Sequence, residues 1–383
     1  MTPSHTQTTD PRSAGVTVLE LAQPGVRSLT PYQPGKPVEA LERELGIRDI
    51  IKLASNENPR GPGTAVRAAI ANAATQLSRY PDGAAYALRQ RLAAQLQIDP
   101  LQLTFGNGSN DVLDVAARVF LGPGKSAVCA AHAFVVYPIA IRGVGAALIE
   151  VPAVNYGADL NAMLAAIRDD TAMLFLANPN NPTGTWVDTN ALQAFLDAVP
   201  RHVIVVLDEA YFEYVEAPNF PDGMQLLGKH PNLIVTRTFS KIHGLAALRL
   251  GFAVSSVEIA DLLNRIRQPF NVNSLAQAAA MAALDDVAYV RNSRDINTAG
   301  MQQITTGLSE MGVGFLPSIG NFLCVECAGS AAPVYDALLR EGVIVRPIAG
   351  YGMSNHLRVT IGLPDENARF LAALARVRRR LGR

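Results

Sequence analysis

Short apolar runs alternate with segments of helical spacing between about residues 63 and 275. The segments "DVLDVAARVF" and "NALQAFLDAV" have the helical spacing and separate apolar runs that are short enough for strands. Near-continuous apolar strands need cover on both faces, so the pattern predicts an α/β fold with a mainly parallel sheet between helices. The predicted strands are 103–106, 126–130, 146–151, 172–177, 203–208, 233–238 and 250–254.

The pattern changes past about residue 275. An Ala-rich helical stretch runs from "SLAQAAAMAALDD" toward "GLSEM", and the apolar runs "NFLCVEC", "GVIVRP" and "HLRVTIG" follow it. This mixture predicts a smaller α+β domain over 276–383, beside a large domain over 59–275. A chain of 383 residues is too long for one small core, which agrees with this division.

The first 58 residues differ from both domains. Residues 1–20 are polar and lack an apolar stretch, which predicts a disordered tail rather than a secretory signal. Residues 21–58 are predicted to form an extended arm, because the prolines of "LTPYQPGKPVEAL" exclude a helix before about residue 38.

Composition excludes several classes of protein. The 33 basic residues balance 33 acidic ones, so no excess of positive charge favours binding to nucleic acid. The sequence contains no run of 18 apolar residues, so no membrane span is predicted. Three cysteines indicate a reducing compartment rather than a disulfide framework, and we expect a cytoplasmic location. The lone "CVEC" lacks a second ligand pair, so no metal site is predicted.

Polar clusters follow five of the predicted strands. They are "GNGSND", "HAFVVYP", "NPNNPTGT", "DEAYFEY" and "FSKIHG". Because ligands of parallel sheets bind at the carboxyl ends of the strands, this order predicts one site at one edge of the sheet.

Each cluster allows both a structural and a functional interpretation. The glycines of "GNGSND" and an N-cap at Ser109 suit a phosphate at a helix start, or form a simple capping turn. The turn "NPNNPTGT" presents Asn181, although such turns commonly serve only to connect secondary-structure elements. Asp208 either caps the next segment or faces a buried cation, and Tyr211 could reach the same pocket.

The basic residues complete the set. Lys241 in "RTFSKIHG" is, on its own, typical of a solvated loop. Ser240 and Arg249 suit a phosphate oxygen, and Arg358 within an apolar strand needs an anion, either a structural carboxylate or a substrate. A cofactor with a phosphate, a protonatable ring nitrogen and an aldehyde would use all of these groups, and pyridoxal phosphate is such a molecule.

The ordered series "GNGSND", "NNPTG", "DEAY", "SK" and the arginine eight residues later resembles the fold-type-I pyridoxal-phosphate aminotransferases. Within them, "PYQPGKP", "NENPRGP", "RYPDG" and "NHLRVTIG" resemble the histidinol-phosphate aminotransferases, and the "PYxPGK" arm discriminates best. The resemblance covers nearly the whole chain after the tail, and implies an aspartate-aminotransferase-like fold and a homodimer.

The resemblance also implies roles for individual residues. Lys241 would bond covalently to the cofactor and later transfer the substrate proton, which requires an amine with a depressed pKa. Asp208 would pair with the ring nitrogen, while Asn181 and Tyr211 would bond the phenolic oxygen. The implied phosphate ligands are Gly108, Ser109, Asn110, Ser240, Arg249 and, from the partner subunit, Tyr80.

The remaining implied residues contact the ring or the substrate. Phe134 would stack on the ring. Arg358 would bind the carboxylate of glutamate and the phosphate of histidinol phosphate. Further candidates for the substrate pocket are Tyr32, Asn56, Asn321 and Arg346.

The implied reaction converts histidinol phosphate and 2-oxoglutarate to imidazole-acetol phosphate and glutamate, a step of histidine biosynthesis. Alternatives on the same fold are an aromatic amino-acid aminotransferase and a phosphothreonine-type decarboxylase. A regulator would need a basic DNA-binding domain, for which a tail of about 20 residues has no room. His132, Ala133, Asn110 and His243 depart from the usual pattern, which bears on substrate preference more than on the chemistry.

Overall fold

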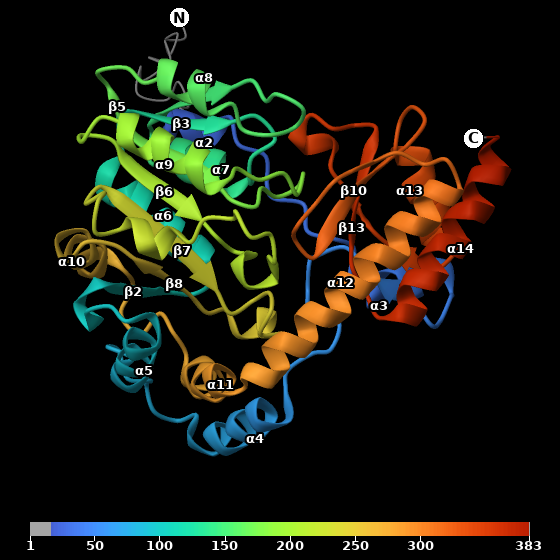
Figure 1. Ribbon diagram of the computed structural model, residues 1–383, viewed down its shortest axis with the longest axis horizontal. Helices are drawn as coiled ribbons and strands as arrows, with labels where there is room; N and C mark the ends of the chain where they lie inside the picture. Colours follow the sequence, from blue (N-terminus) through green and yellow to red (C-terminus); the bar gives the residue numbers. More distant parts are fainter. Residues whose placement is uncertain (1–16, 383) are drawn as a thin grey trace, which may run out of the picture.

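The computed structural model describes residues 17–382. A seven-stranded sheet forms the centre of the large domain (Figure 1), in the order β2-β8-β7-β6-β5-β3-β4. Its strands are β2 (Leu103–Gly106), β3 (Ser126–Ala130), β4 (Ala147–Val151), β5 (Thr171–Ala177), β6 (Ile204–Asp208), β7 (Leu233–Thr238) and β8 (Gly251–Val254). All seven lie where the apolar runs predict them.

Strand direction confirms a mainly parallel sheet with one exception. Neighbouring strands from β7 through β6, β5 and β3 to β4 are parallel. β8 is antiparallel to both β7 and β2. The connection from β7 to β8 contains only a short 3₁₀ helix (Ala246–Leu248), so the chain returns beside β7 in the opposite direction instead of crossing over through a longer helix.

Helices cover both faces of this sheet, as predicted. Along β5, Met173 and Phe175 pack in one cluster while Leu174 and Leu176 pack in the opposite one. The helices against the first face are α6 (Ser109–Phe120), α7 (Val136–Gly143) and α10 (Val257–Ile266). Those against the second face are α8 (Leu160–Ala165) and α9 (Thr189–Ala198).

A third cluster lies at the β2 edge of the sheet. It joins β2 and β8 to the helices α4 (Thr64–Ala73), α5 (Tyr86–Leu96) and α11 (Ser274–Asp285). The alanines of α11 pack there against α4 and α5. The predicted domain boundary at 275 would therefore cut a large-domain helix, and we propose a boundary at Asp286, before α12 (Val287–Glu310).

The small domain is an antiparallel sheet backed by helices. Its strands have the order β12-β13-β10-β9. They are β9 (Phe315–Leu316), β10 (Phe322–Glu326), β12 (Arg346–Pro347) and β13 (His356–Thr360). Its helices are α12, α13 (Ala332–Arg340) and α14 (Pro364–Leu381), and α12 runs between the two domains in Figure 1.

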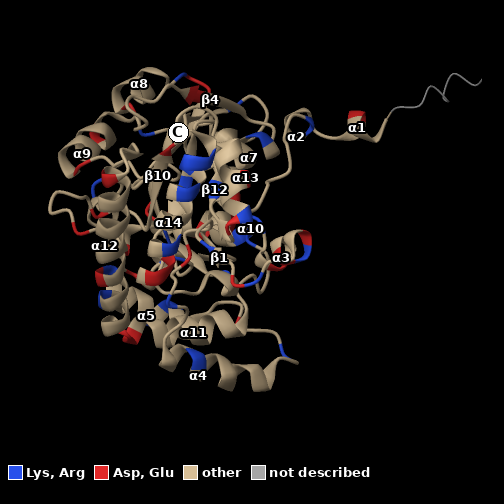
Figure 2. Cartoon of the chain, turned by 90° about the vertical axis from the view of Figure 1, so that its right-hand side faces the viewer, with Lys and Arg blue, Asp and Glu red and all other residues tan. Residues whose placement is uncertain are grey.

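The arm joins the small domain. β1 (Ile51–Lys52) pairs in parallel with β11 (Val343–Ile344), and α3 (Val38–Leu45) begins where the prolines end, as predicted. The helical turn α2 (Pro24–Arg27) lies against α7, whereas the exposed turn α1 (Val18–Leu21) projects from the body of the molecule (Figure 2). The predicted disordered tail 1–20 lies mostly outside the described residues, and α1 forms a helical turn at its end.

Within residues 17–382, no helix is long and apolar enough to cross a membrane. The same part of the chain holds no group of three or more metal-ligating side chains. Cys129, Cys324 and Cys327 are buried and form no disulfide.

Candidate active site

A cavity of about 200 Å³ opens where the carboxyl ends of the large-sheet strands meet the small domain. Thirteen predicted site residues from both domains and the arm line it. They are Tyr32, Asn56, Ser109, Asn110, Phe134, Asn181, Asp208, Tyr211, Ser240, Lys241, Arg249, Arg346 and Arg358.

Lys241 follows β7 and extends its amine into the cavity wall. Its Nζ donates to the Ser55 carbonyl oxygen at 3.3 Å and lies 5.6 Å from the centre of the Tyr211 ring. Burial lowers the pKa of Lys241 to about 8, and the nearby Arg358 guanidinium acts in the same direction. The amine therefore loses its proton far more readily than an exposed lysine, as a nucleophile and proton acceptor requires.

Asp208 is a buried carboxylate at the end of β6. It accepts hydrogen bonds from Tyr137 (2.8 Å) and Thr236 (2.9 Å), and burial raises its pKa although both bonds oppose that change. The two hydroxyls donate hydrogen bonds to the carboxylate oxygens, but they are neutral and leave the negative charge of Asp208 unbalanced. Because Asp208 also lines the cavity, this environment suits a cation such as a protonated ring nitrogen.

The start of α6 and Arg249 form an anion-binding corner. Gly108 has φ of +84° and is the N-cap of α6, so the predicted N-cap Ser109 is wrong by one residue and is instead the first helical residue. A Cβ at Gly108 would overlap Arg249 Nη2, and one at Gly251 would overlap the Ser109 nitrogen. Glycine at both places lets the helix N-terminus approach the guanidinium, which suits a phosphate.

Ser240 completes this corner, since its hydroxyl accepts from Arg249 Nη1 at 3.3 Å. Opposite lies Phe134, whose ring meets that of Tyr137 edge-on with centres 5.8 Å apart. Tyr137 in turn donates to Asp208. The cavity thus combines an anion corner, an apolar ring and a buried carboxylate, which fit the phosphate, ring face and ring nitrogen of pyridoxal phosphate.

Arg358 lies on β13 and is buried. Its Nη1 donates to Asn181 Oδ1 and its Nη2 to the Ala54 carbonyl oxygen, both at 2.6 Å, while Nε has no partner in the described part of the chain. Both bonds within residues 17–382 go to neutral oxygens. Of the two interpretations that the sequence left open, this favours a substrate anion over a structural carboxylate.

Asn56 lines the cavity, and Asn321 lies behind it. The Asn56 side chain donates to the Tyr211 hydroxyl at 2.9 Å, which leaves the Tyr211 proton available for another acceptor. The buried Asn321 side chain donates to the Asn56 backbone oxygen at 3.0 Å. Asn321 is not among the residues that line the cavity, and here it supports Asn56, so its contact with a substrate stays a prediction.

The arm closes one side of the cavity. Tyr32 lies 5.1 Å below the Arg346 guanidinium, which also donates to the Gln33 carbonyl oxygen. Arg346 and Arg358 thus line the same cavity from neighbouring strands of the small domain.

Tyr80 lies outside this cavity. Its side chain is 82% exposed and its ring stacks on Phe270 at 4.7 Å. The role implied for it acts on a partner subunit, so its place in one chain neither supports nor opposes that role.

Several residues that the sequence did not single out also contribute. Tyr137 lies in the first turn of α7, and only the fold brings it to Asp208. His243, by contrast, was noted in the sequence for its departure from the usual pattern, and it does not line the cavity: it is buried on Phe239, burial lowers its pKa to about 4, and its Nδ1 has no partner within residues 17–382. The missed lining residues are Ala54, Ser55, Ala177, Pro179, Ala210, Thr238 and Tyr351.

The fold and this cavity are those of an aminotransferase. Residues 48–374 match the family described as "Aminotransferase class I and II", and the chain belongs to this family. A Thermus thermophilus aspartate aminotransferase has the same fold, with a TM-score of 0.79 at 22% identity, over 93% of this chain and 99% of that one.

Within this family, the similar curated proteins are histidinol-phosphate aminotransferases. "Histidinol-phosphate aminotransferase 2" of Pseudomonas fluorescens is 58% identical over 94% of this chain and 98% of its own length. The protein of the same name from Pseudomonas aeruginosa has the same identity and coverage. A histidinol-phosphate aminotransferase from Sinorhizobium meliloti, solved with pyridoxal-5'-phosphate, has a TM-score of 0.86 and 31% identity over 94% of this chain and 98% of its own. The resemblance seen in the sequence is therefore confirmed.

Proposed function

We propose that the chain is a pyridoxal-phosphate-dependent histidinol-phosphate aminotransferase. It would convert histidinol phosphate and 2-oxoglutarate to imidazole-acetol phosphate and glutamate in histidine biosynthesis. The observation that carries the proposal is one cavity that joins the low-pKa Lys241, the buried Asp208 and the anion corner of Ser109 and Arg249. Relatives named for this activity, at 58% identity, supply the substrate.

Residues of the large domain would hold the cofactor and move the proton. When bound, pyridoxal phosphate supplies an electron sink that lets the substrate Cα lose a proton, and carries the amino group between substrates. Lys241 Nζ would bond to it and, once displaced by substrate, would take the Cα proton as general base. Asp208 would keep the ring nitrogen protonated.

Neighbouring groups would orient the cofactor. Tyr211 would donate to the phenolic oxygen, since its own oxygen already accepts from Asn56. Asn181 has its side-chain oxygen engaged by Arg358, which leaves its NH₂ to donate to the same place. Ser109, Asn110, Ser240 and Arg249 would bind the phosphate, and Phe134 would cover the ring face.

The arginines would bind the substrates. Arg358 Nε lacks a partner, and Arg346 lies one strand away. Glutamate, 2-oxoglutarate and histidinol phosphate are all anionic, so the two guanidiniums suit both half-reactions. We include in the proposal a cytoplasmic homodimer in which Tyr80 reaches the phosphate of the partner subunit.

Single-turnover spectroscopy tests the function. The purified protein, loaded with cofactor, is mixed separately with histidinol phosphate, phenylalanine or tyrosine, and the absorption of the bound cofactor is followed. We expect histidinol phosphate to convert it fastest. Faster conversion by phenylalanine would show an aromatic amino-acid aminotransferase, and release of CO₂ would show a decarboxylase.

A further inference from the structure

The loop that follows β3, residues 131–135, contacts one residue of the small domain at two points. His132 Nδ1 lies 2.5 Å from the Tyr351 carbonyl oxygen, and because a carbonyl only accepts, Nδ1 carries the proton. The backbone N–H of Val135 meets the phenolic oxygen of the same tyrosine. Between these two points lies Phe134, which lines the reaction cavity.

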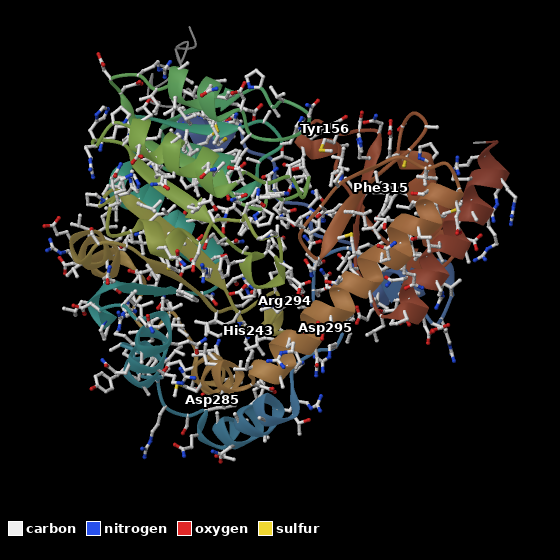
Figure 3. All side chains as sticks on the ribbon, viewed as in Figure 1. Tyr156, His243, Asp285, Arg294, Asp295 and Phe315 are labelled. Carbon is white, nitrogen blue, oxygen red and sulfur yellow. The ribbon has the colours of Figure 1, made fainter. Side chains whose placement is uncertain are left out.

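His132 is itself held in place from the large domain. Its φ of +58° is uncommon for a residue with a side chain, and the surrounding contacts stabilise it. The Asn180 side chain donates to its carbonyl oxygen at 3.0 Å. Its ring lies 5.7 Å from that of Tyr156, which Figure 3 shows at the edge of the large domain that faces the small one.

The same group of contacts reaches the substrate-binding strand. The Tyr156 ring meets His356 edge-on at 5.2 Å, and His356 lies two residues before Arg358 on β13. Asn180 precedes Asn181, which accepts from Arg358. His132 therefore contacts the segments that carry both the tyrosine and the arginine of the small-domain wall.

Ile348 and Met353 anchor the Tyr351 segment in a buried cluster, but Tyr351 itself is only partly buried. Tyr351 lines the reaction cavity on one side and, on the other, a second cavity of about 200 Å³ shared with His132 and Gly352. With open space on both sides, directed hydrogen bonds have more weight in fixing the position of this segment.

We propose that His132 is a positioning residue: by donating to the Tyr351 carbonyl it holds the small-domain wall of the cavity against the Phe134 loop. Its catalytic consequence rests on the proposed function, because Tyr351 and Arg358 would surround the bound substrate. His132 itself does not line the reaction cavity and takes no part in proton transfer.

Two substitutions separate the hydrogen bond from the backbone conformation. His132→Gly removes the donor and accepts a positive φ without strain. His132→Asn also tolerates this φ, and its side-chain NH₂ stands at the branch position of Nδ1, so it can restore the bond. His202→Asn, at an exposed position of the α9–β6 connection, is the matched control.

Hydrogen exchange over residues 346–353 and steady-state kinetics are measured for each protein. For His132→Gly we expect exchange about fivefold faster in this segment, and a KM for histidinol phosphate about fivefold higher with kcat nearly unchanged, the effect of losing one net hydrogen bond. His132→Asn should recover most of both values, and His202→Asn should match the wild type.

Unchanged exchange in His132→Gly would overturn the proposal, and so would an Asn variant as impaired as the Gly variant, because the donor would then be irrelevant. A wild-type protein that does not convert histidinol phosphate would overturn the proposed function instead. Exchange needs no substrate, so it decides the role of His132 in either case.

Discussion

Burial and the Arg358 guanidinium together lower the pKa of Lys241 to about 8. Below that pH the amine is protonated and cannot attack an aldehyde, and above it the amine is free. The rate at which the cofactor-free protein captures pyridoxal phosphate covalently should therefore rise with pH, reach half of its plateau near pH 8 and level off above about pH 9. Stopped-flow absorbance between about pH 6 and 10 measures this rate.

The Lys241→Arg variant is the control for this experiment, because arginine stays charged and forms no such bond. A rate that keeps rising toward the ordinary lysine pKa near 10.4 would contradict the prediction.

At the scale of elements, the junction between α6 and the loop before β8 is tightly packed. Gly108 has a positive φ, and a Cβ there would overlap Arg249 Nη2. Gly108→Ala should therefore displace the guanidinium and weaken pyridoxal phosphate binding by about tenfold or more, the effect of 1–3 kcal/mol of strain. Fluorescence titration of the cofactor-free protein measures the dissociation constant.

Gly143→Ala serves as the matched control, because Gly143 ends α7 with nothing within 4 Å of a new Cβ. It should leave the affinity unchanged. Melting temperatures of both cofactor-free variants separate a local effect from general unfolding, and an unchanged affinity in a folded Gly108→Ala protein would refute the assigned phosphate corner.

At the scale of the whole molecule, the prediction concerns Tyr80, which is exposed and lies outside the cavity of its own chain. If it serves the partner subunit of a twofold dimer, Lys241→Ala and Tyr80→Ala chains should complement each other. A purified mixed dimer would then have one site with both defects and one intact site, and should have about half the wild-type activity.

The same experiment has a clear negative outcome. If Tyr80 served its own chain, each site of the mixed dimer would have one defect and activity would stay at the level of the single variants. Sedimentation should first give a mass of about twice 40.8 kDa; a monomer that is fully active would exclude the shared site.

Much of the large domain was predictable from sequence because its signals are local. The runs "LTFG", "SAVCA" and "LIVTRT" coincide with β2, β3 and β7 at both ends. Buried parallel strands are short continuous apolar runs, and their ends are marked by glycine, proline and polar residues. The antiparallel direction of β8 was not predictable, since an apolar run carries no direction.

The candidate site also divides into residues with a local sequence signal and residues without one. Asp208 and Lys241 were found because they lie at the ends of strands at one sheet edge, and Arg249 because it follows Lys241 by eight residues, in an order shared with known aminotransferases. Tyr137, Tyr351 and the support that Asn321 gives to Asn56 were missed, because nothing in the neighbouring residues indicates these contacts. We propose moving the boundary from 275 to Asp286 for a similar reason: the sequence of α11 fits either domain, and only the packing of its alanines on α4 assigns it to the large one.

The sequence by itself determined which segments are strands, where the polar clusters follow them, and that a lysine and a carboxylate lie at one edge of the sheet. Hydrophobic periodicity and turn-forming residues act over a few positions, so they can be recognised in the sequence alone. Only the tertiary structure decided which groups touch: Arg358 meets neutral oxygens, Asp208 meets two hydroxyls, and His132 reaches Tyr351 across 219 positions. Such contacts depend on how distant elements pack, and this packing is a property of the whole fold.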